Sequence, residues 1–152
     1  MTASTDSRRY LPAGLPIPVS EPDGLSAPYW AGLREGRLLV QRCKTCSTWQ
    51  FGPEWLCHRC HRFDPDWVEV APRGSIYSWE RVWHPSHAAL TGHGPYLAVL
   101  VELPDAGNVR MIGSLLGDPL QEVTIGSNVT GVFEHHPDAE TPYSLLQWKS
   151  NT

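Results

Sequence analysis

Residues 37–70 read RLLVQRCKTCSTWQFGPEWLCHRCHRFDPDWVEV, and this stretch decides the fold because it contains all four cysteines of the 152-residue chain. They form two C-x-x-C pairs, Cys43 with Cys46 and Cys57 with Cys60, with ten residues between the pairs. Each C-x-x-C turn can direct two sulfur atoms toward one point, so the two turns supply four thiolates for a tetrahedral metal ion. Four thiolates leave no open coordination position, and we therefore predict one structural Zn²⁺ per chain, with iron as the alternative metal.

Two other interpretations of these cysteines stay open. C-x-x-C pairs also act as redox dithiols, although such pairs normally lie at the strand-to-helix junction of a βαβ unit, a pattern that is absent here. Alternatively, His58 or His61 replaces one thiolate as a metal ligand. Strands are predicted on both sides of the cysteines, at 37–42 and 67–70, and together these features predict a rubredoxin-like zinc ribbon over residues 37–70. A bound metal would stabilise a segment that is too small to bury a core of its own.

The segment before the ribbon, residues 1–36, is predicted to form an N-terminal arm and one short helix. Residues 1–25 contain four prolines and show no helical or alternating apolar period, which is typical of an extended arm. Ser26 is predicted as the N-cap of the helix, and Gly36 as the residue that ends it.

The segment after the ribbon, residues 71–152, is predicted to consist of short strands separated by turns. We expect these strands at 75–84, 96–103, 109–116, 126–134 and 144–148. In the first of them, strict alternation would place Ile76 and Val82 on one face and Tyr77 and Trp79 on the other. Five short antiparallel strands suit a small barrel of the OB type, with a sandwich fragment as the alternative. The predicted fold class is therefore mainly β.

The composition excludes several classes of protein. Fourteen prolines and thirteen glycines argue against an all-helical bundle. No run of 18 apolar residues is present and the first 25 residues lack the pattern of a secretion signal, so we expect a cytoplasmic protein with no membrane partner.

Charge is unevenly distributed around a net value of −4. Residues 34–81 carry eight basic and six acidic side chains, whereas residues 82–152 carry two basic and seven acidic ones. An acidic barrel opposes binding to phosphate backbones, and we expect no nucleic-acid partner.

The order of motifs along the chain resembles a known family. These motifs are Pro28-Tyr29-Trp30, QRCKTC at 41–46, CHRC at 57–60, RGSIYSWERVWHP at 73–85, PYLAVLVEL at 95–103 and IGSNVTGVFE at 125–134. They resemble the zinc-ribbon and OB-fold acyl-CoA-associated proteins of domain-of-unknown-function family 35, and the resemblance covers about residues 16–148. It implies a companion of thiolase-fold enzymes, either archaeal thiolase and hydroxymethylglutaryl-CoA synthase assemblies or thiolase-like aldolases that cleave steroid side chains by a retro-aldol reaction of a CoA thioester.

The chain departs from the family pattern at three places. Ser47 stands where the family usually has glycine, His58 where it has proline, and Gly52-Pro53-Glu54 where Pro-Pro-Arg is frequent. The missing arginine removes one ligand contact that the resemblance would otherwise imply, while all four cysteines remain.

Candidate contacts with a ligand or partner fall into three groups. The basic group, which is able to hold CoA phosphates through charge-assisted hydrogen bonds or simply to form local ion pairs, comprises Arg59, Arg62, Arg73 and Arg81. The second group lies in the long loop 84–95, where we expect a solvated segment that orders against a partner, with acid–base chemistry or a second metal as the alternative; it comprises His84, His87 and His93. The third group consists of the aromatic residues Trp55 and Trp83.

The aromatic residues allow two interpretations. Trp49, Phe51, Trp55 and Trp67 surround the expected metal site and exceed what a short ribbon can bury, which predicts an exposed apolar patch for a partner. Tyr77, Trp79, Trp83 and Tyr96 would be able to stack on nucleic-acid bases, but the acidic barrel favours core packing or a partner face.

The sequence contains no nucleophile with a base and orienting group, no Gly-rich phosphate loop and no paired carboxylates. We therefore predict a non-catalytic accessory subunit that forms a hetero-oligomer with a thiolase-fold or aldolase subunit, most specifically a retro-aldol lyase acting on the side chain of a steroid CoA thioester. The alternatives are an accessory subunit of a biosynthetic thiolase, a single-stranded nucleic-acid-binding module, and a free-standing acyl-CoA hydrolase or hydratase.

Overall fold

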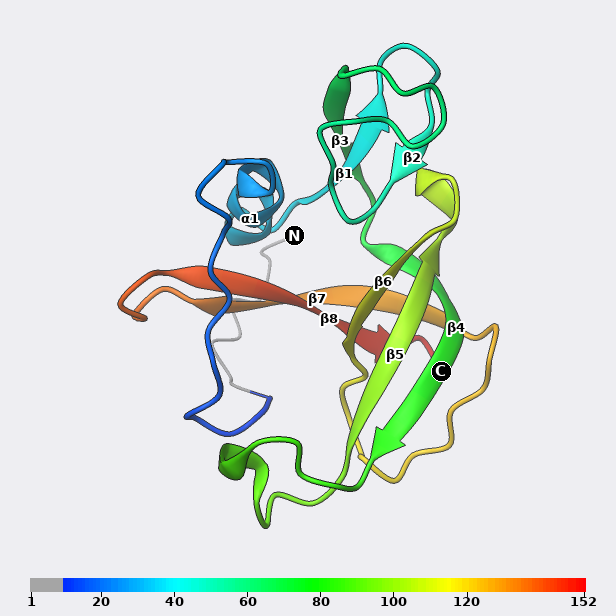
Figure 1. The fold of residues 1–152 in the computed structure, drawn as a ribbon. Coiled ribbons are helices and arrows are strands. Elements are labelled where there is room, and N and C mark those ends of the chain that lie inside the picture. The colour runs from blue at the N-terminus through cyan, green and yellow to red at the C-terminus, as the bar shows by residue number, and fades with distance from the viewer. Residues whose placement is uncertain (1–9) are drawn as a thin grey trace.

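Two antiparallel sheets and one short α-helix make up the computed structural model, which describes residues 10–152 (Figure 1). Residues 1–9 of the predicted arm lie outside the described residues. The elements are α1 (Ala27–Arg34), β1 (Leu38–Cys43), β2 (Trp49–Gln50), β3 (Pro65–Val70), β4 (Arg73–Val82), β5 (Tyr96–Leu103), β6 (Val109–Ser114), β7 (Asn128–His136) and β8 (Tyr143–Ser150), with 3₁₀ turns at Ala88–Leu90 and Pro104–Ala106.

Helix α1 begins and ends close to the predicted residues, but its capping differs from the prediction. The Ser26 side chain makes no capping hydrogen bond, and the Ser26 backbone is already helical. At the other end, Gly36 adopts a positive φ of 71° and the Arg37 N–H donates to the Gly32 carbonyl at 2.8 Å, which turns the chain directly into β1. Within the described part of the chain, no helix is long and apolar enough to cross a membrane.

The smaller sheet has the strand order β2-β1-β3 and carries the cysteine turns at one end. Strands β1 and β3 are antiparallel, with Leu38 opposite Val70 and Val40 opposite Val68. Strand β2 was not predicted, because two residues are too few to produce a periodic pattern.

The larger sheet has the order β6-β5-β4-β7-β8, and every neighbouring pair is antiparallel. A single parallel bridge between Leu115 and Trp148, with the Leu116 N–H donating to the Trp148 carbonyl at 2.8 Å, brings the end of β6 against β8. The sheet is thereby a nearly closed five-stranded barrel, which confirms the OB-type prediction.

The strict alternation predicted for β4 is wrong. The pairing register with β5 shifts between Ile76 and Ser78, so Tyr77 is an extra residue in the strand. Ile76 is buried, and after the bulge Trp79 rather than Val82 packs against the core. Such a bulge bends the strand, which is how a short sheet curls into a barrel.

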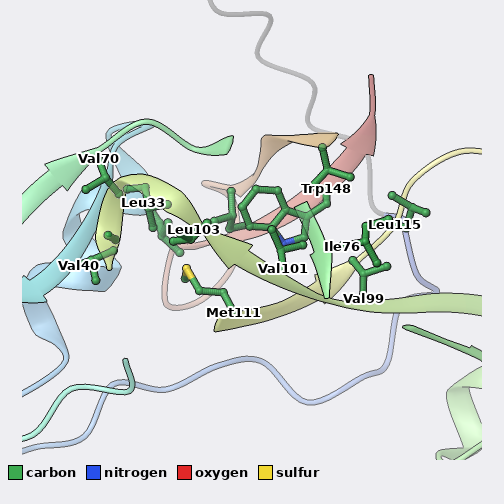
Figure 2. Close-up of a cluster of buried hydrophobic side chains, with 14 of the residues drawn as sticks. Leu33, Val40, Val70, Ile76, Val99, Val101, Leu103, Met111, Leu115 and Trp148 are labelled. Carbon is green, nitrogen blue, oxygen red and sulfur yellow. The ribbon is translucent and has the colours of Figure 1, made fainter. Parts of the chain in front are cut away.

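The ribbon, helix and barrel share one hydrophobic core. Leu33 from α1, Leu38 from β1 and Val70 from β3 belong to the same buried cluster as Leu103 and Trp148 of the barrel. Figure 2 shows the Trp148 indole among the barrel side chains, with Leu33, Val40 and Val70 at the left of the view as the part of the cluster that helix α1 and the zinc ribbon contribute. The ribbon therefore covers one end of the barrel with its own apolar residues.

Candidate metal centre

Two equivalent turns present the cysteines. In the first, the Ser47 N–H donates to the Cys43 carbonyl at 2.9 Å, and in the second the His61 N–H donates to the Cys57 carbonyl at 2.9 Å. Ser47 and His61 both have a φ of 61°, the left-handed conformation that lets the chain fold back behind each sulfur pair.

The four sulfur atoms converge on one point. Cys43 Sγ lies 3.6 Å from Cys60 Sγ, and Cys46 Sγ lies 3.6 Å from Cys57 Sγ. All four lie within 4.8 Å of one another. Zn–S bonds of about 2.3 Å in a tetrahedron place the sulfurs roughly 3.8 Å apart, so the arrangement fits one structural zinc ion. The closed coordination shell leaves the metal no position for a substrate.

Thr48 favours the thiolate form of one of the four cysteines, Cys46. Its Oγ1 lies 3.1 Å from Cys46 Sγ. Hydrogen bonds from the Thr48 side chain and from its backbone N–H lower the pKa of the Cys46 thiol to about 6. Because the thiolate is the form that binds metal, this ligand is available at neutral pH.

The histidines beside the cysteines are not part of the sulfur cluster. His58 Nδ1 lies 2.9 Å from Gln50 Oε1, and His61 serves as the left-handed residue of the second turn. The cluster that the described residues offer to a metal consists of the four cysteines, as predicted.

Two buried glutamines, neither of which was predicted from the sequence, hold the loop that joins the cysteine pairs. Gln50 Nε2 donates to Gln41 Oε1 at 2.6 Å, and Gln41 bonds to both the N–H and the carbonyl of Glu54, at 3.0 and 2.8 Å. Gln41 is only 1% exposed. A polar residue inside an apolar strand such as LLVQRC is the signal that could have identified this role.

The left-handed residues allow a first test. Replacing Ser47 with glycine should raise the free energy of unfolding of the zinc-loaded protein by about 0.5–1 kcal/mol, because glycine adopts a positive φ without the steric cost of a Cβ. Urea denaturation measures the change. Ser47→Ala is the matched control and should give no gain, whereas equal stabilisation by alanine would contradict the explanation.

The four candidate arginines occupy two different regions. Arg59 and Arg62 are exposed in and beside the second cysteine turn. Arg73 forms a two-pronged ion pair with Asp105, at 2.8 and 3.2 Å. Arg81 donates to the Pro119 and Gln121 carbonyls, at 2.8 and 2.6 Å. The latter two side chains thus already have intramolecular partners.

The histidines of loop 84–95 do not gather into one site. His84, His87 and His93 are all exposed, and His87 Nδ1 accepts a hydrogen bond from the Ala89 N–H at 3.1 Å. The loop contains a 3₁₀ turn that buries Leu90, so part of it is ordered by the chain itself.

The aromatic residues near the metal divide between core and surface. Trp49 and Phe51 pack against the shared core, Phe51 beside Tyr29. Trp55 remains 49% exposed, and Trp83, which directly follows β4, is 65% exposed. Of the four aromatic residues from which an exposed apolar patch was predicted, Trp55 is the exposed one and Trp67 is half-buried, because the ribbon shares its interior with the barrel.

A zinc ribbon joined to an OB-type barrel is the class that this fold and metal centre define. Comparison with family models agrees: the rubredoxin-like zinc ribbon domain of ChsH2 matches residues 30–66, and the C-terminal OB-fold domain of ChsH2 matches residues 67–134. The chain belongs to this ChsH2 family of zinc-ribbon and OB-fold proteins.

Two solved structures resemble most of the chain. The Ltp2-ChsH2(DUF35) aldolase aligns with 29% identity and a TM-score of 0.74 over 90% of this chain and 100% of the matched one. A protein of unknown function from the DUF35 family of Sulfolobus solfataricus aligns with 14% identity and a TM-score of 0.59 over 84% of this chain and 85% of its own, which shows the common fold.

One curated protein is similar to this chain over part of its own sequence. The protein described as a probable enoyl-CoA hydratase alpha subunit of Thermomonospora curvata is 35% identical over 101 residues. The match covers 66% of this chain but only 30% of the relative, so most of that protein lies outside the shared region.

Proposed function

We propose that this chain is a non-catalytic accessory subunit that binds and stabilises a thiolase-fold enzyme acting on acyl-CoA thioesters. In its specific form, the partner is a retro-aldol lyase that removes a steroid side chain. The observation that carries the proposal is the likeness to ChsH2 in the Ltp2-ChsH2 aldolase, which extends over 90% of this chain.

The chemistry of the metal centre supports an accessory role. Four thiolates saturate the ion, so it stabilises the ribbon and does not polarise a substrate. Large apolar side chains remain exposed on both modules and are available to a protein partner. They are Trp55 and Phe63 on the ribbon, and Trp83 and Ile112 on the barrel, where Phe63 and Ile112 are 78% and 73% exposed.

A hydratase partner is a second candidate, favoured by the description of the Thermomonospora relative. The nucleic-acid alternative receives less support. Arg73 and Arg81 are engaged within the chain, and the Arg110 guanidinium lies 3.6 Å from the centroid of the Tyr77 ring, where a base would need to stack.

Co-expression with the thiolase-like protein encoded nearest to this chain tests the proposal. The two proteins should elute as one complex in size-exclusion chromatography with light scattering. Cleavage of a steroid side-chain CoA thioester should require the thiolase-like subunit, whereas this chain alone should show no turnover. Separate elution at micromolar concentration, or turnover by this chain alone, would refute the accessory role, and hydration without cleavage would select the hydratase partner.

Single substitutions on each module test which surface of this chain binds the partner enzyme. Trp55→Ala and Trp83→Ala leave the buried core intact, and at least one should weaken the complex about 10-fold, as expected for an aromatic anchor at the centre of an interface. Lys149→Ala, an exposed change without aromatic area, is the control.

A further inference from the structure

A cleft of about 270 Å³ lies on the barrel, away from the metal centre. Most of its lining is apolar and includes Leu11, Leu97, Leu115 and Leu116. The N-terminal segment forms one side, and near it Gly14 approaches the 3₁₀ turn of loop 84–95 at the lower end of the molecule (Figure 1).

Four residues with polar side chains also line the cleft, and they are Tyr10, His93, Tyr96 and Ser114. Within residues 10–152, the His93 imidazole, the Tyr96 hydroxyl and the Ser114 hydroxyl have no hydrogen-bond partner. An apolar cleft with a few polar groups is the usual composition of a small-molecule site.

Residues 114–119 form the first wall of the cleft, and hydrogen bonds with residues outside the lining hold this wall in place. Arg81 donates to the Pro119 and Gln121 carbonyls, and Gln121 Nε2 donates to the Leu116 carbonyl at 3.0 Å. The Ser114 N–H donates to Gln147 Oε1 at 2.8 Å, which links the end of β6 to β8. This wall therefore needs no ligand to form.

The second wall, Tyr10 and Leu11, rests on a buried carboxylate. The Tyr10 N–H donates to Glu134 Oε1 at 3.3 Å. Glu134 is only 4% exposed and is also bonded to His136 Nε2 at 3.0 Å and to Gln147 Nε2 at 2.8 Å. The same Gln147 therefore links both walls, and the cleft is built by one continuous polar network behind an apolar surface.

We propose that this cleft binds a neutral, compact apolar molecule of one or two rings that carries a carbonyl group. The volume lies just below the ~300 Å³ at which pockets for drug-sized ligands begin, which sets the size. The lining residues include no Asp, Glu, Lys or Arg, which selects an uncharged ligand. Hydroxyl groups on Tyr96 and Ser114, and an imidazole N–H on His93, donate to a carbonyl oxygen.

The isolated chain is sufficient for the test, so the result is independent of the partner proposed above. The probe is 1-decalone, a neutral bicyclic ketone, with decahydronaphthalene-1-carboxylate as the charged comparison. Saturation-transfer NMR and shift titration of the zinc-loaded protein should show 1-decalone bound with a Kd of about 1 mM, and the carboxylate bound at least about 5-fold more weakly.

Substitutions on the lining locate the bound ketone. Leu116→Trp fills the cleft and should weaken 1-decalone at least about 10-fold, whereas Leu120→Trp, on the same loop but 62% exposed and outside the lining, should change binding less than about 2-fold. His93→Trp is the second filling variant, chosen because its exposed position tolerates change, with His84→Trp as its control.

Absence of 1-decalone binding to the wild-type chain would overturn the proposal. Equal weakening by Leu120→Trp or His84→Trp, or equal affinity for the carboxylate, would overturn it as well.

Discussion

Cys57→Ser should eliminate stoichiometric zinc binding and lower the Tm of the chain by about 10 °C or more. Structural zinc in ribbons of this size contributes roughly 10–16 kcal/mol of apparent binding free energy, and three thiolates with a hydroxyl hold the ion far less tightly. The loss should spread beyond the ribbon, because Leu38, Val40 and Val70 belong to the core that covers the barrel. Without the metal, the ribbon has little to keep these three side chains in place.

Zinc content by plasma emission spectrometry and a thermal melt measure the two effects. Arg59→Ser is the matched control, since it lies inside the same C-x-x-C turn, is exposed and contributes no sulfur. It should retain one zinc ion and the wild-type Tm. A Cys57→Ser protein with full zinc content and an unchanged melt would show that the four-thiolate assignment is wrong.

Trp148→Ala should lower the free energy of unfolding by about 3–5 kcal/mol, a large part of the total stability of an ordinary domain. Trp148 is 0% exposed and lies on β8 where the barrel closes against β6. Its neighbour Gly113 leaves room for the indole, since a Cβ there would lie 2.8 Å from Trp148 Cδ1.

Urea denaturation of the zinc-loaded protein measures this loss. Trp83→Ala removes the same indole from a site that is 65% exposed and should change the free energy of unfolding by less than about 0.5 kcal/mol. Trp148→Phe should cost less than alanine, because it retains a ring and removes an indole N–H that has no hydrogen-bond partner within the described residues. A loss of less than about 1 kcal/mol for Trp148→Ala would contradict the role assigned to this residue.

The parts of the fold that depend on neighbouring residues were predictable from the sequence. Helix α1 ends at Arg34, two residues before the predicted stop at Gly36, and the strands expected at 96–103 and 109–116 form as β5 and β6, paired across a short turn, although β6 already ends at Ser114. Features that break a local pattern were not predictable from the sequence. Tyr77 interrupts an alternating strand, and β2 is too short for any period, because both owe their conformation to the strand beside them.

The same division holds for the sites. The spacing of the four cysteines determined the metal centre, because a C-x-x-C turn brings its two sulfurs together through local backbone geometry alone. The buried pair of Gln41 and Gln50 was hidden, since the need for a hydrogen-bond partner arises only after both side chains leave water.

By itself, then, the sequence determined that this protein holds a structural zinc ion in a ribbon and continues into short antiparallel strands. Only the tertiary structure decided that the ribbon and barrel share one core, and that Leu11 and Leu116, more than a hundred residues apart, face the same cleft. The physical reason is how far apart along the chain the interacting residues lie. Sulfur convergence and strand alternation depend on residues close along the chain, whereas burial depends on which surfaces remain to be covered once those elements have formed.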